Sequence, residues 1–151
     1  MAMDTKDMVK RLSSLVQLDI DAAHSYGQAI DEIDVPGIRQ QVAQFRDDHL
    51  RHINELSEVI RNYGETPPEY SRDIKGFVLE GFTAIRSLTG TEGALKALHT
   101  NEKITNRMYA DARTWDLLSD AKNTVEINYS DEQRHIRYLE EAIENRLWEK
   151  K

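Results

Sequence analysis

The sequence contains no cysteine, and only three prolines and two tryptophans among its 151 residues. The absence of cysteine excludes disulfides, zinc ribbons, cysteine-ligated iron–sulfur clusters and thiol nucleophiles in this chain. It also fits a reducing compartment, so we expect a cytoplasmic protein. The few prolines fall in two segments that are typical of turns and loops, Asp34–Gly37 and Glu65–Tyr70.

Long apolar runs and runs of basic residues are missing too. The N-terminal segment MAMDTKDMVK mixes acids and bases and has no apolar core of the kind a secretory signal requires, and the apolar run Gly76–Ile85 is interrupted by Glu80. We therefore expect a soluble protein with no membrane partner. A net charge of −7, with no Lys/Arg run interleaved with aromatics, argues against nucleic acid as a partner and suits divalent cations.

The chain does contain apolar residues at helical spacing. They predict four long helices at about 5–33, 36–63, 92–117 and 120–148. Asp4 or Thr5, Thr91 and Ser119 are predicted to cap the first, third and fourth helices, and Pro36 is predicted to occupy the first position of the second. A short helix is predicted at about 72–88, and no segment alternates like a strand. Because 151 residues are the size of one ordinary domain, the sequence predicts a single all-α domain over 1–151.

Two halves of the chain repeat each other at an offset of 83 residues. The string D-H-L-R-H-I-N-E-L that begins at Asp48 matches D-E-Q-R-H-I-R-Y-L at Asp131. Further matching pairs at this offset are Leu12/Leu95, Leu15/Leu98, Tyr26/Tyr109, Val42/Val125 and Ile60/Ile143. We interpret the halves as duplicated helical hairpins, 5–63 and 92–149, joined by a long crossover at 64–91 that contains the short helix.

Each half carries the same polar pattern on its apolar stripes: an acid, then His or Glu, and then a His three residues later. The six residues are Asp19, His49, His52, Glu102, Glu132 and His135. A helix rises about 1.5 Å per residue, so the members of each set lie at one level of their hairpin. Antiparallel packing of the hairpins places all six in one layer. Burying three carboxylates together is prohibitive unless cations or protons compensate them.

Such a layer is how a four-helix bundle surrounds a pair of metal ions, so the six residues are predicted metal ligands. The alternative is a degenerate layer that is held by arginine pairs or shared protons. The string Asp131–His135 has the form D-E-x-R-H, which resembles the motif in the fourth helix of the ferritin-like di-iron four-helix-bundle superfamily. The resemblance covers nearly the whole chain and is closest to small uncharacterised bacterial ferritin-like bundles with an extra short helix before helix three.

The resemblance implies a role for each predicted ligand. Asp19 and Glu102 match the terminal carboxylates, and Glu132 matches a bridging carboxylate. His52 and His135 match the terminal imidazoles. The resemblance also implies that neighbouring acids orient the imidazoles, that arginines hold those acids and that two tyrosines lie near the metals. These neighbours are Asp48, Arg51, Asp131, Arg134, Tyr26 and Tyr109. From residue type alone, such tyrosines are as readily core residues and such acids and arginines as readily solvated.

His49 departs from the family's pattern, which has a second bridging Glu at this position. A neutral imidazole does not bridge two metals, so the predicted site stabilises two ferric ions less well. His49 can hold one metal terminally, or the site can hold a single ion or favour Mn or Zn. His99, one turn before Glu102, is a further candidate ligand, although its counterpart in the first half is Val16.

The predicted function is that of a non-haem di-iron or mixed-metal protein that binds Fe(II) and reacts it with oxygen or peroxide, in iron handling or oxidative-stress defence. Such a protein is a ferroxidase- or peroxidase-type oxidoreductase. Two alternatives are an oxygen carrier or sensor like the hemerythrins, whose longer His-x₃-acid spacings are absent, and a non-catalytic bundle, with or without metal, that acts through a partner. A homodimer is expected, because Trp115, Trp148 and the extra helix offer apolar surface.

Overall fold

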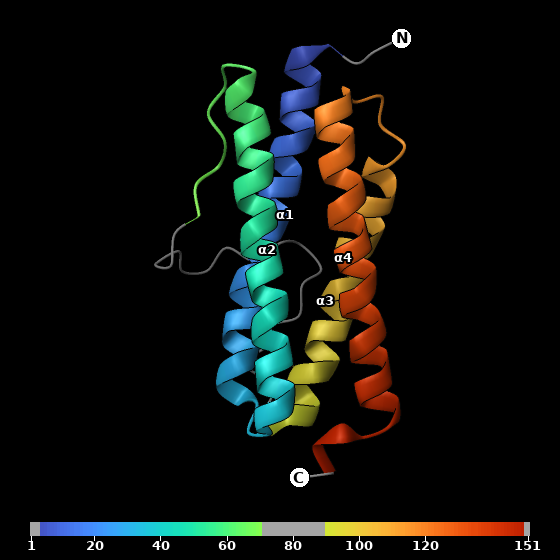
Figure 1. Cartoon of the computed structure of the whole chain (residues 1–151). Coiled ribbons are helices and arrows are strands. Elements are labelled where there is room, and N and C mark those ends of the chain that lie inside the picture. The colour runs from blue at the N-terminus through green and yellow to red at the C-terminus, as the bar shows by residue number, and fades with distance from the viewer. Residues whose placement is uncertain (1–3, 71–89, 150–151) are drawn as a thin grey trace.

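A computed structural model of the chain describes residues 4–70 and 90–149. Its helices are α1 (Thr5–Glu32), α2 (Pro36–Asn62), α3 (Gly90–Ala112) and α4 (Ser119–Glu144), followed by the 3₁₀ turn η2 (Leu147–Glu149). The described residues contain no strand. The predicted all-α four-helix bundle is confirmed, whereas the short helix predicted at 72–88 lies outside the described residues (Figure 1).

The first two helices begin as their sequences predict. The Asp4 carboxylate caps α1 by accepting a hydrogen bond of 2.9 Å from the Asp7 backbone N–H. Pro36 occupies the first turn of α2, where its missing N–H costs no hydrogen bond. Gly64, with a φ of 79°, follows the end of α2 in the left-handed conformation that glycine adopts without strain.

The bounds of α3 and α4 differ from the prediction. α3 ends at Ala112 rather than near 117, and the Thr114 hydroxyl hydrogen-bonds the Asp111 carbonyl there at 2.6 Å, which offers that carbonyl an alternative to the helical N–H. α4 ends at Glu144 rather than 148, because Arg146 has a positive φ of 49°. Leu118, not Ser119, is its N-cap residue.

Thr91 does not cap α3 as predicted, because α3 already begins at Gly90. Its hydroxyl accepts from the Asp34 backbone N–H at 3.1 Å and donates to the Asp34 carboxylate at 2.7 Å. Thr91 therefore ties the start of α3 to the turn between α1 and α2.

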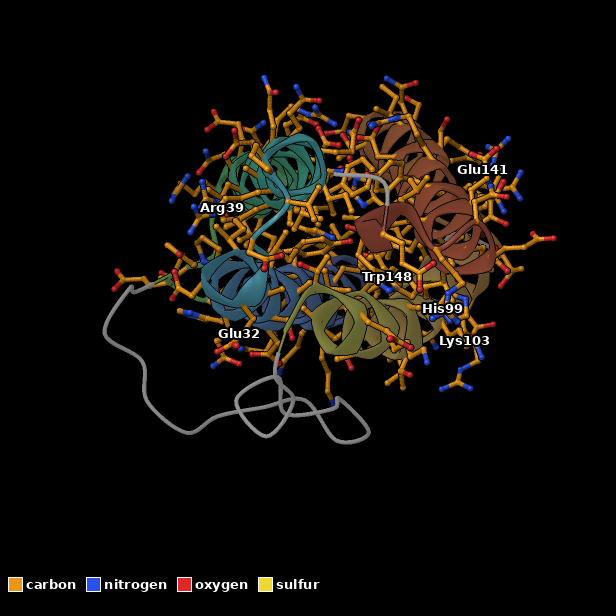
Figure 2. The ribbon with its side chains drawn as sticks, turned by 90° about the horizontal axis from the view of Figure 1, so that it is seen from below. Glu32, Arg39, His99, Lys103, Glu141 and Trp148 are labelled. Atoms are coloured by element: carbon orange, nitrogen blue, oxygen red, sulfur yellow. The ribbon has the colours of Figure 1, made fainter. Side chains whose placement is uncertain are left out.

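The four helices pack side by side, with α1 next to α2 and α3, and with α4 next to α3 and α2 (Figure 1). Viewed along the bundle, α1 lies diagonally across from α4, and α2 across from α3 (Figure 2). Of these neighbouring pairs, α2 and α4 touch each other least. Each hairpin has the same architecture, and the duplication of one from the other stays a prediction.

Buried apolar side chains form two clusters, and the six predicted ligands lie between them. One cluster includes Leu12, Leu56 and Val125, and the other includes Phe45 and Leu139. Each helix passes from one cluster to the other through the polar level. Among residues 4–70 and 90–149, none of the helices has the length and hydropathy that a bilayer-crossing helix needs.

Candidate metal centre

The structure brings the six predicted ligands together in the middle of the bundle, although they come from all four helices. α1 contributes one acid, α2 two imidazoles, α3 one acid, and α4 an acid and an imidazole. Each of the six is at most 1% exposed. The six are Asp19, His49, His52, Glu102, Glu132 and His135. Their ligand atoms fall into two overlapping groups, within each of which the atoms lie no more than 4.8 Å apart.

The first group gathers around Asp19. Its Oδ1 atom lies 2.7 Å from His49 Nδ1 and 3.0 Å from His52 Nδ1. Glu132 Oε1 lies 3.3 Å from the same His49 nitrogen and 3.4 Å from His52 Nδ1. Two carboxylates and two imidazoles therefore face one point from three helices.

The second group gathers around Glu102. Its Oε1 atom lies 3.1 Å from His49 Nε2 and 3.7 Å from His135 Nδ1. Glu132 Oε2 lies 3.5 Å from that His135 nitrogen. Glu132 and His49 belong to both groups, so they stand between the two candidate metal positions.

Two atoms of this cluster are buried without a hydrogen-bond partner, namely Glu132 Oε1 and His135 Nδ1. A buried polar atom without a hydrogen-bond partner costs free energy, since the atom has given up water and received nothing in return. Both atoms point into the candidate metal groups. A cation at these positions would satisfy both atoms once the imidazole has given up its Nδ1 proton.

Acids from the opposite hairpin hold the outer nitrogens of two imidazoles. His52 Nε2 lies 2.9 Å from Asp131 Oδ2, and His135 Nε2 lies 2.8 Å from Asp48 Oδ2. Each imidazole donates its Nε2–H to a carboxylate there, which leaves Nδ1 directed at the cluster. This arrangement fixes the tautomer and ring orientation of a metal-binding histidine.

Two arginines link these outer acids into a ring between α2 and α4. Arg134 Nη2 donates to Asp48 Oδ2 at 2.8 Å and to Asp131 Oδ1 at 3.0 Å. Arg51 donates to Asp48 at 3.2 Å and also to Asp131. We refer to these four residues as the ionic ring. It covers the outer side of the two imidazoles, between α2 and α4, which are the neighbouring helices that touch each other least.

Two buried tyrosines hold the acids of α1 and α3, again from the opposite hairpin. Tyr26 donates to Glu102 Oε1 at 2.9 Å, and Tyr109 donates to Asp19 Oδ2 at 2.5 Å. Burial and then the nearby carboxylates raise the pKa of both phenols well above the usual value, so both stay protonated donors. Tyr109 in turn accepts a hydrogen bond from Asn128.

Charge is balanced inside the cluster by the imidazoles. Burial opposes a charged ring, but the carboxylates of Glu132, Asp19 and Glu102 raise the pKa of His49 to about 9. Their acidic neighbours also raise the pKa values of His52 and His135 well above the usual value, against the effect of burial. Protonated imidazoles therefore compensate the buried carboxylates in the metal-free protein, and a metal ion has to displace those protons.

Comparison with known proteins places this architecture in a family. A family model described as "Domain of unknown function (DUF2383)" matches residues 7–114. The chain belongs to the DUF2383 family. The matched residues include α1, α2 and α3 and four of the six predicted ligands, and they end before α4. No curated protein and no solved structure matches the chain.

His99 of this DUF2383 protein does not join the cluster, contrary to its consideration as a further ligand. It lies at the edge of the bundle, and its Nε2 is 3.8 Å from the Glu140 carboxylate (Figure 2). It is in neither group of candidate ligands. His99 lies three residues before Glu102, so its Cα is about 60° around α3 and about 4.5 Å along the axis from that of Glu102, and this displacement is enough to place it outside the polar layer.

Thr105 and Asn106 contact the site but were assigned no chemical role from the sequence. The Thr105 hydroxyl lies 3.0 Å from Glu102 Oε2 and 3.1 Å from Glu132 Oε2, and the Asn106 amide donates to the backbone carbonyls of Glu102 and Glu132. Their counterparts in the first half are Ala22 and Ala23. Aligning the two halves could have identified Thr105 and Asn106, because each replaces an alanine of the first half with a polar residue close to a predicted ligand.

Replacing Asp48 or Asp131 with asparagine in this DUF2383 protein is expected to weaken metal binding about 10- to 100-fold, because an amide holds the Nε2–H of its imidazole less strongly than a carboxylate does. Metal affinity measured by competition with a coloured chelator checks this. The control is Asp47→Asn, which changes an exposed acid on the same helix. If the metal affinities equal that of the control, the two acids pair with Arg51 and Arg134 but do not contribute to metal binding.

Proposed function

We propose that this chain is a ferritin-like protein that holds two metal ions, iron by preference, and reacts Fe(II) with oxygen or peroxide in iron handling or oxidative-stress defence. The observation that carries the proposal is the pair of overlapping buried ligand groups, which share Glu132 and His49. The unpartnered Glu132 Oε1 and His135 Nδ1 atoms inside those groups support it.

The chemistry of the ligand atoms fits such ions. Carboxylate oxygens and imidazole nitrogens together suit Fe(II), and they also accept Mn(II) and Zn(II). Asp19 and His52 would hold one ion, and Glu102 and His135 the other, with Glu132 facing both. Bound iron supplies the one-electron chemistry that oxygen and peroxide require.

The protein's own residues would set the conditions for that chemistry. The ligands exclude bulk water, since each is at most 1% exposed. Tyr26 and Tyr109 fix the orientation of the carboxylates of α3 and α1, and Asp48 and Asp131 fix the orientation of the imidazoles of His135 and His52. Rings and carboxylates that are already oriented lose little conformational freedom when a metal binds.

A non-catalytic role is the second candidate, in which the bundle acts through a partner. The hydrogen bonds from His49 to both Asp19 and Glu102 favour it, because they let a protonated imidazole balance the layer without any metal. In this case the polar layer specifies the packing of the helices rather than a reaction.

Protein loaded anaerobically with Fe(II) and desalted is expected to retain one to two ions per chain, roughly as a ligand set of this kind implies. A ligand that binds only the folded state at about 100 times its Kd stabilises it by about 2.7 kcal/mol, so chelation should lower the melting temperature. Elemental analysis, thermal unfolding and oxygen uptake measure these effects. Retention of no ions, with equal melting temperatures, would refute metal binding. Retained iron that consumes neither oxygen nor peroxide would favour the non-catalytic role.

A further inference from the structure

A line of aromatic rings leads from the metal centre to the surface. The ring of Phe45, buried in α2, lies 4.3 Å from the His135 imidazole between ring centroids, with an interplanar angle of 34°. The Tyr138 ring also contacts Phe45, with 5.4 Å between ring centroids and an interplanar angle of 80°. Tyr138 is partly exposed and lines a surface pocket of about 420 Å³ on α4.

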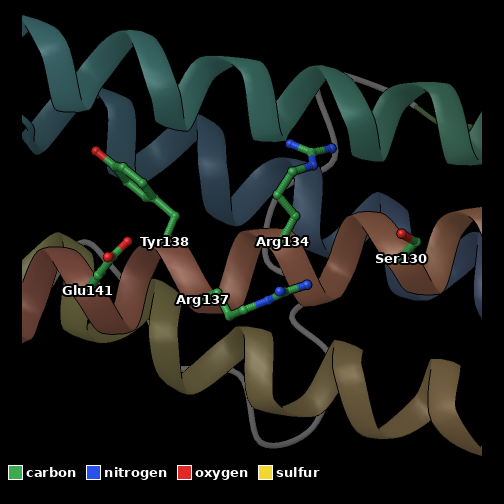
Figure 3. Close-up of a pocket in the computed structure, with 5 residues that line it drawn as sticks. All are labelled: Ser130, Arg134, Arg137, Tyr138 and Glu141. Carbon is green, nitrogen blue, oxygen red and sulfur yellow. The ribbon is translucent and has the colours of Figure 1, made fainter.

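The pocket carries two arginines beside Tyr138. It is lined by Ser130, Arg134, Arg137, Tyr138 and Glu141 (Figure 3). The Arg134 guanidinium also belongs to the ionic ring, and it lies 5.8 Å from the centre of the Phe45 ring. Arg134 is paired with the two acids of the ionic ring, whereas the exposed Arg137 adds positive charge beside the partly exposed ring of Tyr138, on a chain whose net charge is −7.

The repeat does not reproduce this line of rings, to which the first half contributes Phe45 and the second half contributes Tyr138 and His135. The residue that corresponds to Phe45 in the second half is Asn128, and the residue that corresponds to Tyr138 in the first half is Glu55. The tyrosines and the ionic ring are identical in both halves, and the six predicted ligands occupy corresponding positions, with His49 opposite Glu132 and Asp19 opposite Glu102. The rings break the repeat on the side of His135, and there they connect a predicted ligand to a pocket.

We propose that the α4 pocket is the docking site of a negatively charged one-electron donor, whose electron reaches the metal centre through the rings of Tyr138 and Phe45 to His135. This inference rests on the proposed function. The donor loses one electron, and a ferric ion held by His135 gains it and becomes ferrous. No bond forms or breaks in the protein. Tunnelling weakens steeply with distance, so two ring contacts of 5.4 and 4.3 Å favour this route.

The chemistry of the pocket favours an anionic donor. A guanidinium group presents a planar fork of donors that matches phosphates and carboxylates. Opposite charge increases the rate of encounter more than it increases the lifetime of the complex, and brief contacts over small areas are typical of electron-transfer partners. Glu141 at the same pocket limits how tightly an anion stays bound.

Reduced flavin mononucleotide and reduced riboflavin are suitable probes, because they share the same redox-active ring system and differ in the phosphate. Each is mixed anaerobically with the ferric protein, and the loss of ferric absorption is followed. The mononucleotide is expected to react about tenfold faster at low ionic strength, and added salt should remove this advantage. Arg137→Gln should remove it as well, whereas Lys103→Gln, which removes a charge from the outside of α3, should retain it. Equal rates for both flavins in the unmodified protein would overturn the docking site.

Tyr138 variants test the route itself. Tyr138→Leu removes the ring and should slow reduction by both flavins, while Tyr138→Phe keeps the ring and should reduce at the original rate. Iron content and melting temperature are measured for each variant, so that a loss of folding is recognised. An unchanged rate in a folded, iron-loaded Tyr138→Leu protein would overturn the route.

A binding measurement on metal-free protein does not depend on iron. Oxidised flavin mononucleotide fluorescence should be quenched on titration with the metal-free chain, and Arg137→Gln should weaken this quenching, whereas riboflavin should respond weakly to both proteins. The same quenching in Arg137→Gln as in the unmodified chain would overturn the site. Absence of retained iron in every variant would refute the proposed function and the route together. Retained iron that both flavins reduce equally would refute the donor site and leave the metal centre standing.

Discussion

Replacing Glu132 or His135 with alanine is expected to abolish tight metal binding. Glu132 belongs to both ligand groups, and its two oxygens face different imidazoles, His52 through Oε1 and His135 through Oε2. His135 supplies an imidazole nitrogen to the second group, and that nitrogen has no hydrogen-bond partner. Removing either ligand should therefore lower the metal affinity by more than the roughly 10- to 100-fold expected when an acid that hydrogen-bonds a ligand is changed.

Metal stoichiometry after desalting, and affinity by chelator competition, measure this loss. Glu132→Gln keeps the shape of the side chain and removes its charge, so it separates loss of a ligand from loss of packing. The matched controls are Glu144→Ala and His99→Ala, which change an exposed acid and an imidazole outside the cluster. Retained stoichiometry in both the Glu132 and His135 variants would mean that the ions bind at other residues.

Replacing His49 with glutamate is expected to change the stability of the metal-free and metal-bound protein in opposite directions. In the metal-free protein, His49 hydrogen-bonds Asp19 at 2.7 Å and Glu102 at 3.1 Å, and its raised pKa of about 9 means that it brings positive charge to them. Glutamate removes that charge and adds a fourth buried carboxylate. The metal-free variant should therefore melt at a lower temperature.

Metal reverses this effect, because the new carboxylate faces both ligand groups and restores the bridging position that the ferritin-like resemblance implies. The variant should bind a second ion more tightly, favour two ferric ions and oxidise Fe(II) faster and more completely than the unmodified protein. Aerobic titration with Fe(II), followed by ferric absorption and stoichiometry, measures the difference.

His49→Gln is the companion variant, since it removes the imidazole without adding a charge. It should lack the gain in ferric stability that glutamate provides. If the unmodified and His49→Glu proteins bind the same number of ions and oxidise them at the same rate, then His49 is not a ligand and the layer is less symmetric than its repeat suggests.

Much of the fold could be predicted, because helical spacing and turn residues are local signals. The apolar stripes gave the four helices, and Asp4, Pro36 and Gly64 marked ends that the structure confirms. The predicted ends of α3 and α4 were wrong. The end of α3 depends on the Thr114 side chain, which competes for a backbone carbonyl, and the end of α4 depends on Arg146, which has a positive φ. Neither leaves a periodic signal in the sequence.

The sequence by itself determined which polar residues share a level. Spacing along a helix fixes both the height and the face of a side chain, so the acid of α1 and the two histidines of α2 had to meet within one hairpin. The same reasoning applied to the second half. Because three of the six residues in this layer are carboxylates, their burial requires compensating positive charge from metal ions or protons.

Only the tertiary structure decided which groups pair across the hairpins. Asp48 holds His135 and Asp131 holds His52, while each tyrosine holds the acid of the other half. It also decided that His49 directs one nitrogen at Asp19 and the other at Glu102, and that Phe45 joins His135 to Tyr138. Helical spacing says nothing about these contacts, because they depend on how one hairpin is rotated and translated against the other, and packing of both apolar clusters sets that geometry.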